Sequence, residues 1–167
     1  EHQALIKARP ILGDWLLTDH FESTRKDVLS HQRKKTKLQQ EVVDMRDRMR
    51  KELLKPEKGM FDLKQDTGGM VDIEFLVQYL VLLKSYEYPE LQKWTDNVRL
   101  IQELITTGAI DEYIAHILKH AYLIYRAAAH QASLQENPAK APEEKFSHLR
   151  QRVESIWNSF LGWPHLS

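Results

Sequence analysis

The sequence predicts an all-α fold, an antiparallel bundle of about six helices around a central apolar helix, Met70–Leu83. Three observations support this prediction. Apolar residues recur mostly at spacings of three and four, which is the helical period. Only 6 glycines and 6 prolines interrupt the 167 residues. The stretch Met70–Leu83 is apolar on most of its sides, and such a helix belongs at the centre of a bundle.

Two short helical segments are predicted at the N-terminal end. Residues 2–8 form the first, which Pro10 stops because proline cannot continue a helical hydrogen-bond ladder. The second begins at Thr18 or Asp19 and runs to about Leu29.

A third helix shows the clearest apolar stripe and follows a basic, polar link over residues 31–37. Pro56 and Gly59 mark its end. The stripe steps by four, three, four and four residues, through Leu38, Val42, Met45, Met49 and Leu53.

An extended segment separates this helix from the central one. Residues 61–66 alternate apolar and polar side chains, which indicates a strand or a strand-like loop. The pair Gly68-Gly69 then breaks the alternation and opens the central helix.

Capping signals delimit the C-terminal helices. Thr95 or Asp96 caps a short helix that ends near Gly108, and Asp111 starts a long one. Residues 137–142 form a loop that ends at the first turn of the last helix, Pro142-Glu143-Glu144. The predicted core stripe of the long helix is Ile114, Ile117, Ala121, Ile124 and Ala128. That of the last helix is Phe146, Leu149, Val153, Ile156 and Phe160.

Composition excludes several classes of protein. The length predicts one domain. The balance of 24 basic and 24 acidic side chains argues against a nucleic-acid partner, since nucleic-acid-binding domains usually have a clear basic excess. With no cysteine, a disulfide scaffold and a thiol nucleophile are excluded, and a cytoplasmic location is expected. The stretch Met70–Leu83 is shorter than the ~20 residues of a membrane span and carries Asp72 and Glu74, so no membrane partner is expected.

The most unusual segment surrounds the glycine pair. A glycine pair before a helix leaves backbone N–H groups free at the positive end of the helix dipole, an arrangement that suits phosphate, and Lys64 lies just upstream. However, Asp66 and Asp72 flank the same turn and repel anions. The structural interpretation is capping, with Gly69 at the N-cap and Asp72 reaching back to its N–H.

Glu74 and Gln78 are four residues apart on the central helix and therefore share a face. A carboxylate on a buried helix needs a partner, because burying it alone is very costly. The candidates for that partner are Arg99, Arg126 and Arg46, either in a structural ion pair or at an interface with a catalytic neighbour.

Two weaker patterns remain. Glu112, His116 and His120 line one helix face, where a solvated surface is favoured over a metal site because three ligands in a straight row rarely converge on one ion. The basic run Arg33–Lys37 is interpreted as a soluble link, with nucleic-acid binding kept as the alternative.

Several motifs together carry a specific resemblance. Residues 61–82 read FDLKQDTGGMVDIEFLVQYLVL, residues 94–100 read WTDNVRL, and the chain opens on EHQALIKARPILGD. The chain resembles the family of bifunctional glutamine synthetase adenylyltransferase/adenylyl-removing enzymes over essentially its whole length, through SIWNSFLG near the C-terminus.

The resemblance implies a multidomain parent. In that family two nucleotidyltransferase-like halves, each followed by a helical domain, remove AMP from glutamine synthetase or add it. The sequence Met70-Val71-Asp72 lacks the basic residue of the removing half and is similar to the adenylylating half. Residues 1–167 are thus expected to form a single helical domain, a C-terminal fragment of a longer chain, in which residues 1–14 continue from the missing nucleotidyltransferase core.

The resemblance also implies which catalytic motif this chain lacks and which partners it has. The family's Asp-x-Asp signature, which holds magnesium, is not in the sequence, so ATP and Mg²⁺ belong to the intact enzyme and the chain alone is expected to be inactive. In one hypothesis, Lys64, Gly68 and Gly69, with Arg9, face the nucleotide cleft. In the other hypothesis, the domain is a regulatory or docking module that binds glutamine synthetase or a PII-type signal protein and relays PII or glutamine signals.

Overall fold

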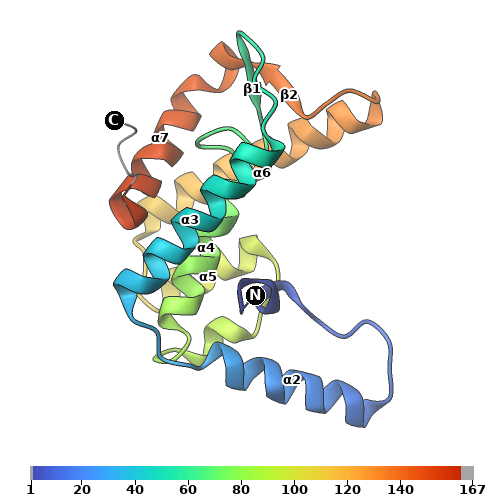
Figure 1. Cartoon of the computed structure of the whole chain (residues 1–167), viewed down its shortest axis with the longest axis vertical. Helices are drawn as coiled ribbons and strands as arrows, with labels where there is room; N and C mark the ends of the chain where they lie inside the picture. The colour runs from blue at the N-terminus through green and yellow to red at the C-terminus, as the bar shows by residue number, and fades with distance from the viewer. Residues whose placement is uncertain (1, 163–167) are drawn as a thin grey trace.

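The computed structural model describes residues 2–162 and confirms the all-α fold (Figure 1). The described residues form seven α-helices, one 3₁₀ turn and a two-stranded sheet. The helices are α1 (His2–Lys7), α2 (Trp15–Leu29), α3 (Lys35–Leu53), α4 (Met70–Lys84), α5 (Asn97–Thr106), α6 (Glu112–Leu134) and α7 (Glu143–Leu161). The 3₁₀ turn η1 covers Pro89–Gln92, and the strands are β1 (Met60–Asp62) and β2 (Lys140–Pro142).

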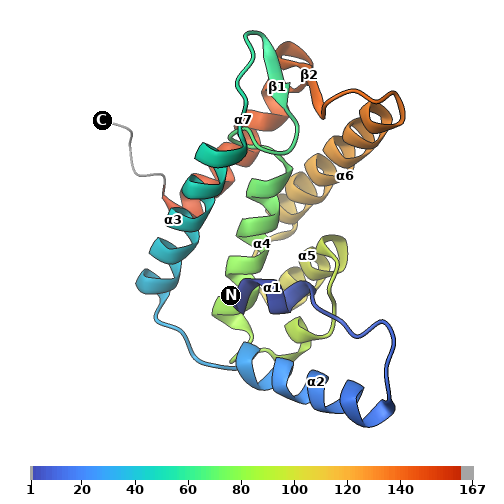
Figure 2. The same ribbon diagram turned by 45° about the vertical axis from the view of Figure 1, so that its right-hand side comes forward.

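The central position predicted for Met70–Leu83 is confirmed. Helix α4 packs against α1, α3, α5, α6 and α7, and most of its residues are buried on all sides (Figure 2). Helix α2 lies at one end of the molecule and the β1–β2 ribbon at the other (Figures 1 and 2). The start of α4 therefore lies near the ribbon end, between α3 and α7.

The small sheet joins two segments far apart in the sequence. Strand β1 pairs antiparallel with β2 in the register Met60↔Pro142, Phe61↔Ala141 and Asp62↔Lys140. The Phe61 ring is fully buried against the rings of Tyr125 and Phe146, at centroid distances of 5.5 and 6.2 Å. Only the first part of the predicted extended segment is a strand, and its partner comes from the predicted loop over residues 137–142.

Most helix ends follow the predicted caps. The Asp96 and Asp111 side chains accept hydrogen bonds from the N–H groups of Arg99 and Ile114, and Gly108 adopts a positive φ of 68° just beyond α5. The predicted start of the second helix was wrong. Helix α2 begins at Trp15 because the Asp14 carboxylate caps the N–H of Leu16 at 2.8 Å.

Two members of the predicted stripes lie outside the core. Leu53 is 48% exposed at the last turn of α3, and Ile124 is 37% exposed on α6. Tyr125, the neighbour of Ile124, is fully buried in its place. The basic link is also shorter than predicted, because α3 begins at Lys35.

Candidate functional site at the start of the central helix

The turn between β1 and α4 is folded by its own aspartates. One oxygen of the Asp62 carboxylate accepts the N–H groups of Lys64 and Gln65, each at 2.9 Å. The Asp66 carboxylate accepts the N–H of Asp62 at 2.7 Å. Such local bonds give aspartate its preference for turns, and they close residues 62–66 into a tight loop.

The two glycines are required by close packing. Gly68 has a φ of +74°, and a Cβ there would lie 2.7 Å from the carbonyl oxygen of Arg150 on α7. A Cβ on Gly69 would lie 2.8 Å from the carbonyl oxygen of Asp66. No side chain fits at either position, so the glycine pair brings the turn into backbone contact with α7.

The N–H groups at the start of α4 are not free, so this part of the phosphate-binding expectation was wrong. Gly69 N–H donates to the Asp66 carbonyl at 2.9 Å, Met70 N–H to the Leu63 carbonyl at 2.9 Å, and Val71 N–H to the Lys64 carbonyl at 3.2 Å. Capping, the alternative interpretation, fits the geometry. The Asp72 carboxylate accepts from Gly68 N–H at 2.7 Å, one residue earlier than expected.

Asp72 also forms a buried ion pair that sequence reasoning missed. Its side chain and that of Arg46 are both fully buried, with 2.6 Å between the Arg46 Nε and the Asp72 Oδ1. Arg50 reaches the same oxygen at 2.9 Å. Burial lowers the pKa of the Arg46 guanidinium, and the Asp72 carboxylate opposes that shift. Arg46 also donates to the Gln65 carbonyl at 2.8 Å, so α3 holds both ends of the turn.

Helix α7 holds the turn from the other side. The Arg150 Nε donates to the Thr67 carbonyl at 2.9 Å and to the Glu154 carboxylate at 3.0 Å. The Arg150 guanidinium also pairs with Glu143 at 2.6 Å. Burial raises the pKa of Glu154 above its usual range, although Arg150 opposes the shift. Between α3 and α7, the turn is a rigid structural unit.

A second polar cluster surrounds Glu74, one turn into α4. None of the arginines proposed from the sequence is its partner. Its Oε1 instead accepts from Lys7 Nζ at 3.4 Å, Asn97 Nδ2 at 3.0 Å and the Tyr122 hydroxyl at 3.1 Å. Burial, and then the Glu74 carboxylate, raise the pKa of Tyr122. The three donors come from α1, α5 and α6, so their convergence could not be read from spacing along one helix.

The predicted site residues differ in their accessibility. Gly68 and Gly69 are buried, whereas Lys64 is exposed on the turn and Arg9 is exposed after α1. Among the described residues no hydrogen bond or ion pair joins Lys64 to Arg9. Whether these four residues face a nucleotide stays a prediction, and only Lys64 and Arg9 offer side chains that a ligand could reach.

The described residues do not fit a magnesium site. Within residues 2–162, no group of three or more histidine, aspartate and glutamate side chains lies close enough to hold a metal ion. His116 and His120 are exposed neighbours on α6, with ring centroids 5.9 Å apart. Over the same range, no helix combines the length and the apolarity needed to cross a bilayer.

The comparison with known proteins assigns the chain that folds into this bundle to a family. Residues 25–157 match the family model described as GlnD PII-uridylyltransferase. Because this match covers most of the 167 residues, the chain belongs to that family.

A particular relative agrees with the motif resemblance and confirms it. The chain is 43% identical over 162 residues to the bifunctional glutamine synthetase adenylyltransferase/adenylyl-removing enzyme of Shewanella loihica. The alignment covers 97% of this chain but only 17% of that enzyme, so the chain spans a small part of its relative's length.

Proposed function

We propose that the chain is a helical accessory domain of an enzyme that adenylylates glutamine synthetase, and that it docks against a nucleotidyltransferase core carried elsewhere in the same polypeptide. One observation carries the proposal. Residues 11–17, here called the apolar segment, include five large apolar side chains that are exposed to solvent. The exposed fractions are 90% for Ile11, 97% for Leu12, 72% for Trp15, 59% for Leu16 and 69% for Leu17.

Exposure on this scale supports an interface. Single exposed apolar residues are ordinary, but a contiguous group marks a surface that another protein part covers. The named relative is a glutamine synthetase adenylyltransferase about six times as long as the matched region, since that region is 17% of it. A longer polypeptide of this kind supplies a domain that could cover the apolar segment.

The helices that flank the apolar segment are tied to the rest of the bundle. Ile6 on α1 is fully buried, and Lys7 bonds to Glu74 on α4. The buried Arg25 of α2 donates to the carbonyls of Leu5 and Ile6 at 2.7 and 3.1 Å. The residues on both sides of the apolar segment are therefore anchored, and a core docked on it would be fixed relative to α4.

In the intact enzyme, the proposed reaction is attack of a glutamine synthetase tyrosine hydroxyl on the α-phosphorus of ATP. AMP is transferred to the tyrosine oxygen and pyrophosphate leaves. Mg²⁺ would be held by the core, since the described residues offer no carboxylate set for it. This chain would shape the nucleotide cleft, to which Lys64 and Arg9 would contribute positive charge. The packed turn at Gly68-Gly69 would fix the position of the backbone that carries Lys64.

The test is AMP transfer to purified glutamine synthetase by the nucleotidyltransferase core of the Shewanella loihica relative, with and without this chain added. Restored transfer supports the proposal if Leu12→Asp abolishes it. The matched control is Leu134→Asp, because Leu134 is 73% exposed at the far end of α6 and should not lie at the interface. Loss of transfer with Lys64→Ala, when the chain still binds the core, would assign Lys64 to the cleft.

A core that transfers AMP fully without this chain would contradict the cleft-shaping role. The regulatory alternative, in which the domain relays PII or glutamine signals, would then be the better account. Direct titration of the chain with a PII-type protein and with glutamine would test that alternative.

A further inference from the structure

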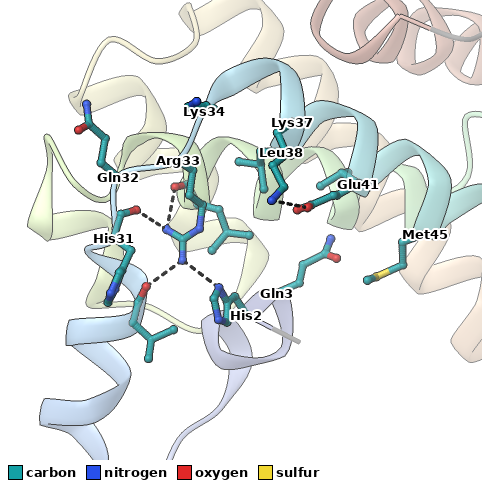
Figure 3. Close-up of a pocket in the computed structure, with 13 residues that line it drawn as sticks. His2, Gln3, His31, Gln32, Arg33, Lys34, Lys37, Leu38, Glu41 and Met45 are labelled. Carbon is teal, nitrogen blue, oxygen red and sulfur yellow. Dashed lines mark hydrogen bonds and ion pairs between the residues drawn. The ribbon is translucent and has the colours of Figure 1, made fainter.

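A groove with a basic lining lies on the side of the molecule away from the β1–β2 ribbon. It has a volume of about 930 Å³ and lies between α1, the link after α2 and the first turns of α3 (Figure 3). This volume is in the range of small-molecule sites.

Positive charge is concentrated in this groove although the whole chain is neutral. Arg33, Lys34 and Lys37 line it together with the imidazoles of His2 and His31. Among its described lining residues, Glu41 is the one acid, and its carboxylate is 3.8 Å from the Lys37 ammonium. The groove thus has an excess of cations over acids that the 24:24 balance of the chain does not suggest.

The start of α3 adds to this positive potential. Lys34 stands at the N-cap in an extended conformation and gives no side-chain cap, and the first turn contains no acidic residue. The first N–H groups of a helix carry partial positive charge and bind anions when no side chain covers them.

Backbone carbonyls hold the Arg33 guanidinium, one of these cations, in place. Its guanidinium donates to the carbonyls of Val28, Leu29 and His31 at 2.8, 3.0 and 2.8 Å. No carboxylate of the described residues lies within ion-pair distance of Arg33. Burial lowers the pKa of this guanidinium. Its charge is compensated only by neutral dipoles, which leaves a counter-anion favourable here.

An independent sign of a missing ligand is the side chain of Gln3. This glutamine is only 9% exposed and lies in the groove, close to Glu41 and Met45 in Figure 3. Its Nε2 is buried without a hydrogen-bond partner. A buried donor without a partner is unfavourable, so an acceptor atom that reached the Gln3 Nε2 would bind favourably there.

We propose that this groove binds the phosphate groups of a nucleotide-sized anion. Lysine ammonium groups and an open helix start suit phosphate, whereas a single carboxylate would need fewer cations. The apolar side chains Leu38, Val42 and Met45 also line the groove and offer contacts to the uncharged part of the ligand. The site is separate from the turn before α4 and does not depend on docking to a core.

The test is calorimetric titration of the 167-residue chain with ATP, pyrophosphate and inorganic phosphate at low salt. Lys34→Ala and Lys37→Ala are each expected to raise the Kd about tenfold, the effect of losing one charge-assisted hydrogen bond. Lys35→Ala is the matched control, since Lys35 is exposed on the same turn but does not line the groove. Gln3→Leu should also weaken binding, with circular dichroism verifying its fold.

The probes distinguish the source of the phosphate. Tighter binding of ATP than of pyrophosphate would identify a nucleotide site. Equal binding of the two would identify a site that recognises the phosphate groups alone. Both results support the proposal. No heat with any probe at millimolar concentration would overturn it. An equal loss of affinity in Lys35→Ala and Lys37→Ala would overturn it as well, because it would indicate general attraction of anions to the basic link.

Discussion

Replacing Asp72 by asparagine should remove a large part of the stability of this domain. The substitution keeps the shape of the side chain and deletes its charge. In the native protein the carboxylate accepts from Arg46 at 2.6 Å, from Gly68 N–H at 2.7 Å and from Arg50 at 2.9 Å. An asparagine can keep only part of this set, because its Nδ2 is a donor that would face other donors.

The magnitude follows from burial. Arg46 and Asp72 are both 0% exposed, so the variant leaves an arginine in the core with no full counter-charge. Breaking a buried pair in this way costs about 3–5 kcal/mol. Domains are stable by only about 5–15 kcal/mol in total. The expected loss is therefore about a fifth or more of the free energy of unfolding.

The assay is urea unfolding followed by circular dichroism, in which a change of midpoint at constant slope reports the free energy of unfolding. Asp47→Asn is the matched control. Asp47 also pairs with Arg50, at 3.3 Å, but its side chain is 31% exposed. Such a surface pair is worth about 0–1 kcal/mol.

The reasoning is refuted if Asp72→Asn and Asp47→Asn lower the free energy of unfolding by the same small amount. A double variant, Arg46→Gln with Asp72→Asn, gives a further check. Its cost should be smaller than the sum of the two single costs, because each single change already leaves the other partner without a counterpart.

Two further predictions concern the turn and its neighbour α7, and a third concerns the anchoring of α1. Gly68→Ala should destabilise by several kcal/mol and Gly59→Ala by only about 1–2, because both have a positive φ but only the first meets backbone, at 2.7 Å; equal losses on urea unfolding would contradict this. Burial raises the pKa of Glu154, so the folded state holds this proton more tightly than the unfolded state. The resulting stabilisation of the folded state is complete below the unfolded pKa, near 4.5, and is lost as the pH rises through the folded pKa. Glu154→Gln should therefore gain stability relative to the native chain as the pH rises above about 4.5, and a constant difference would exclude the burial effect. Arg25→Met should release α1 by orphaning the carbonyls that Arg25 binds, and trypsin should cleave after Lys7 faster than in the native chain.

Local signals in the sequence predicted the helices well. The caps at Asp96 and Asp111 and the glycine at 108 were confirmed, because each acts within one turn of chain. The central helix was also predicted, since its apolar residues cover most of its circumference. Where the local signal was ambiguous, as at Asp14 and Trp15, the predicted start was three or four residues late.

Partners from different elements could not be predicted. Arg46 was a candidate for Glu74, yet it binds Asp72, 26 residues away, because α3 packs against the face of α4 that carries Asp72. The partners of Glu74 come from three helices, and a single sequence contains no signal for such convergence. The occupied N–H groups at Gly69 and Met70 were missed for the same reason, since their acceptors depend on how the turn closes.

The apolar segment was predicted only as a continuation from a missing core, and its exposure became visible in the structure. Trp15 lies within it at 72% exposure, whereas Trp157 is 1% exposed and Trp94 is half-buried. The fluorescence of Trp15 should therefore be the most sensitive report of a change in the surroundings of this segment.

The most direct test of the central claim is tryptophan fluorescence of this chain mixed with the nucleotidyltransferase core of the relative. The tryptophans of the core are replaced beforehand, so that all tryptophan emission comes from this chain. If the apolar segment docks, emission should shift to shorter wavelength as Trp15 leaves water, and the shift should vanish in Trp15→Phe. Unchanged emission from a mixture in which sedimentation shows the two parts bound would contradict the account, because docking would then occur elsewhere on the domain.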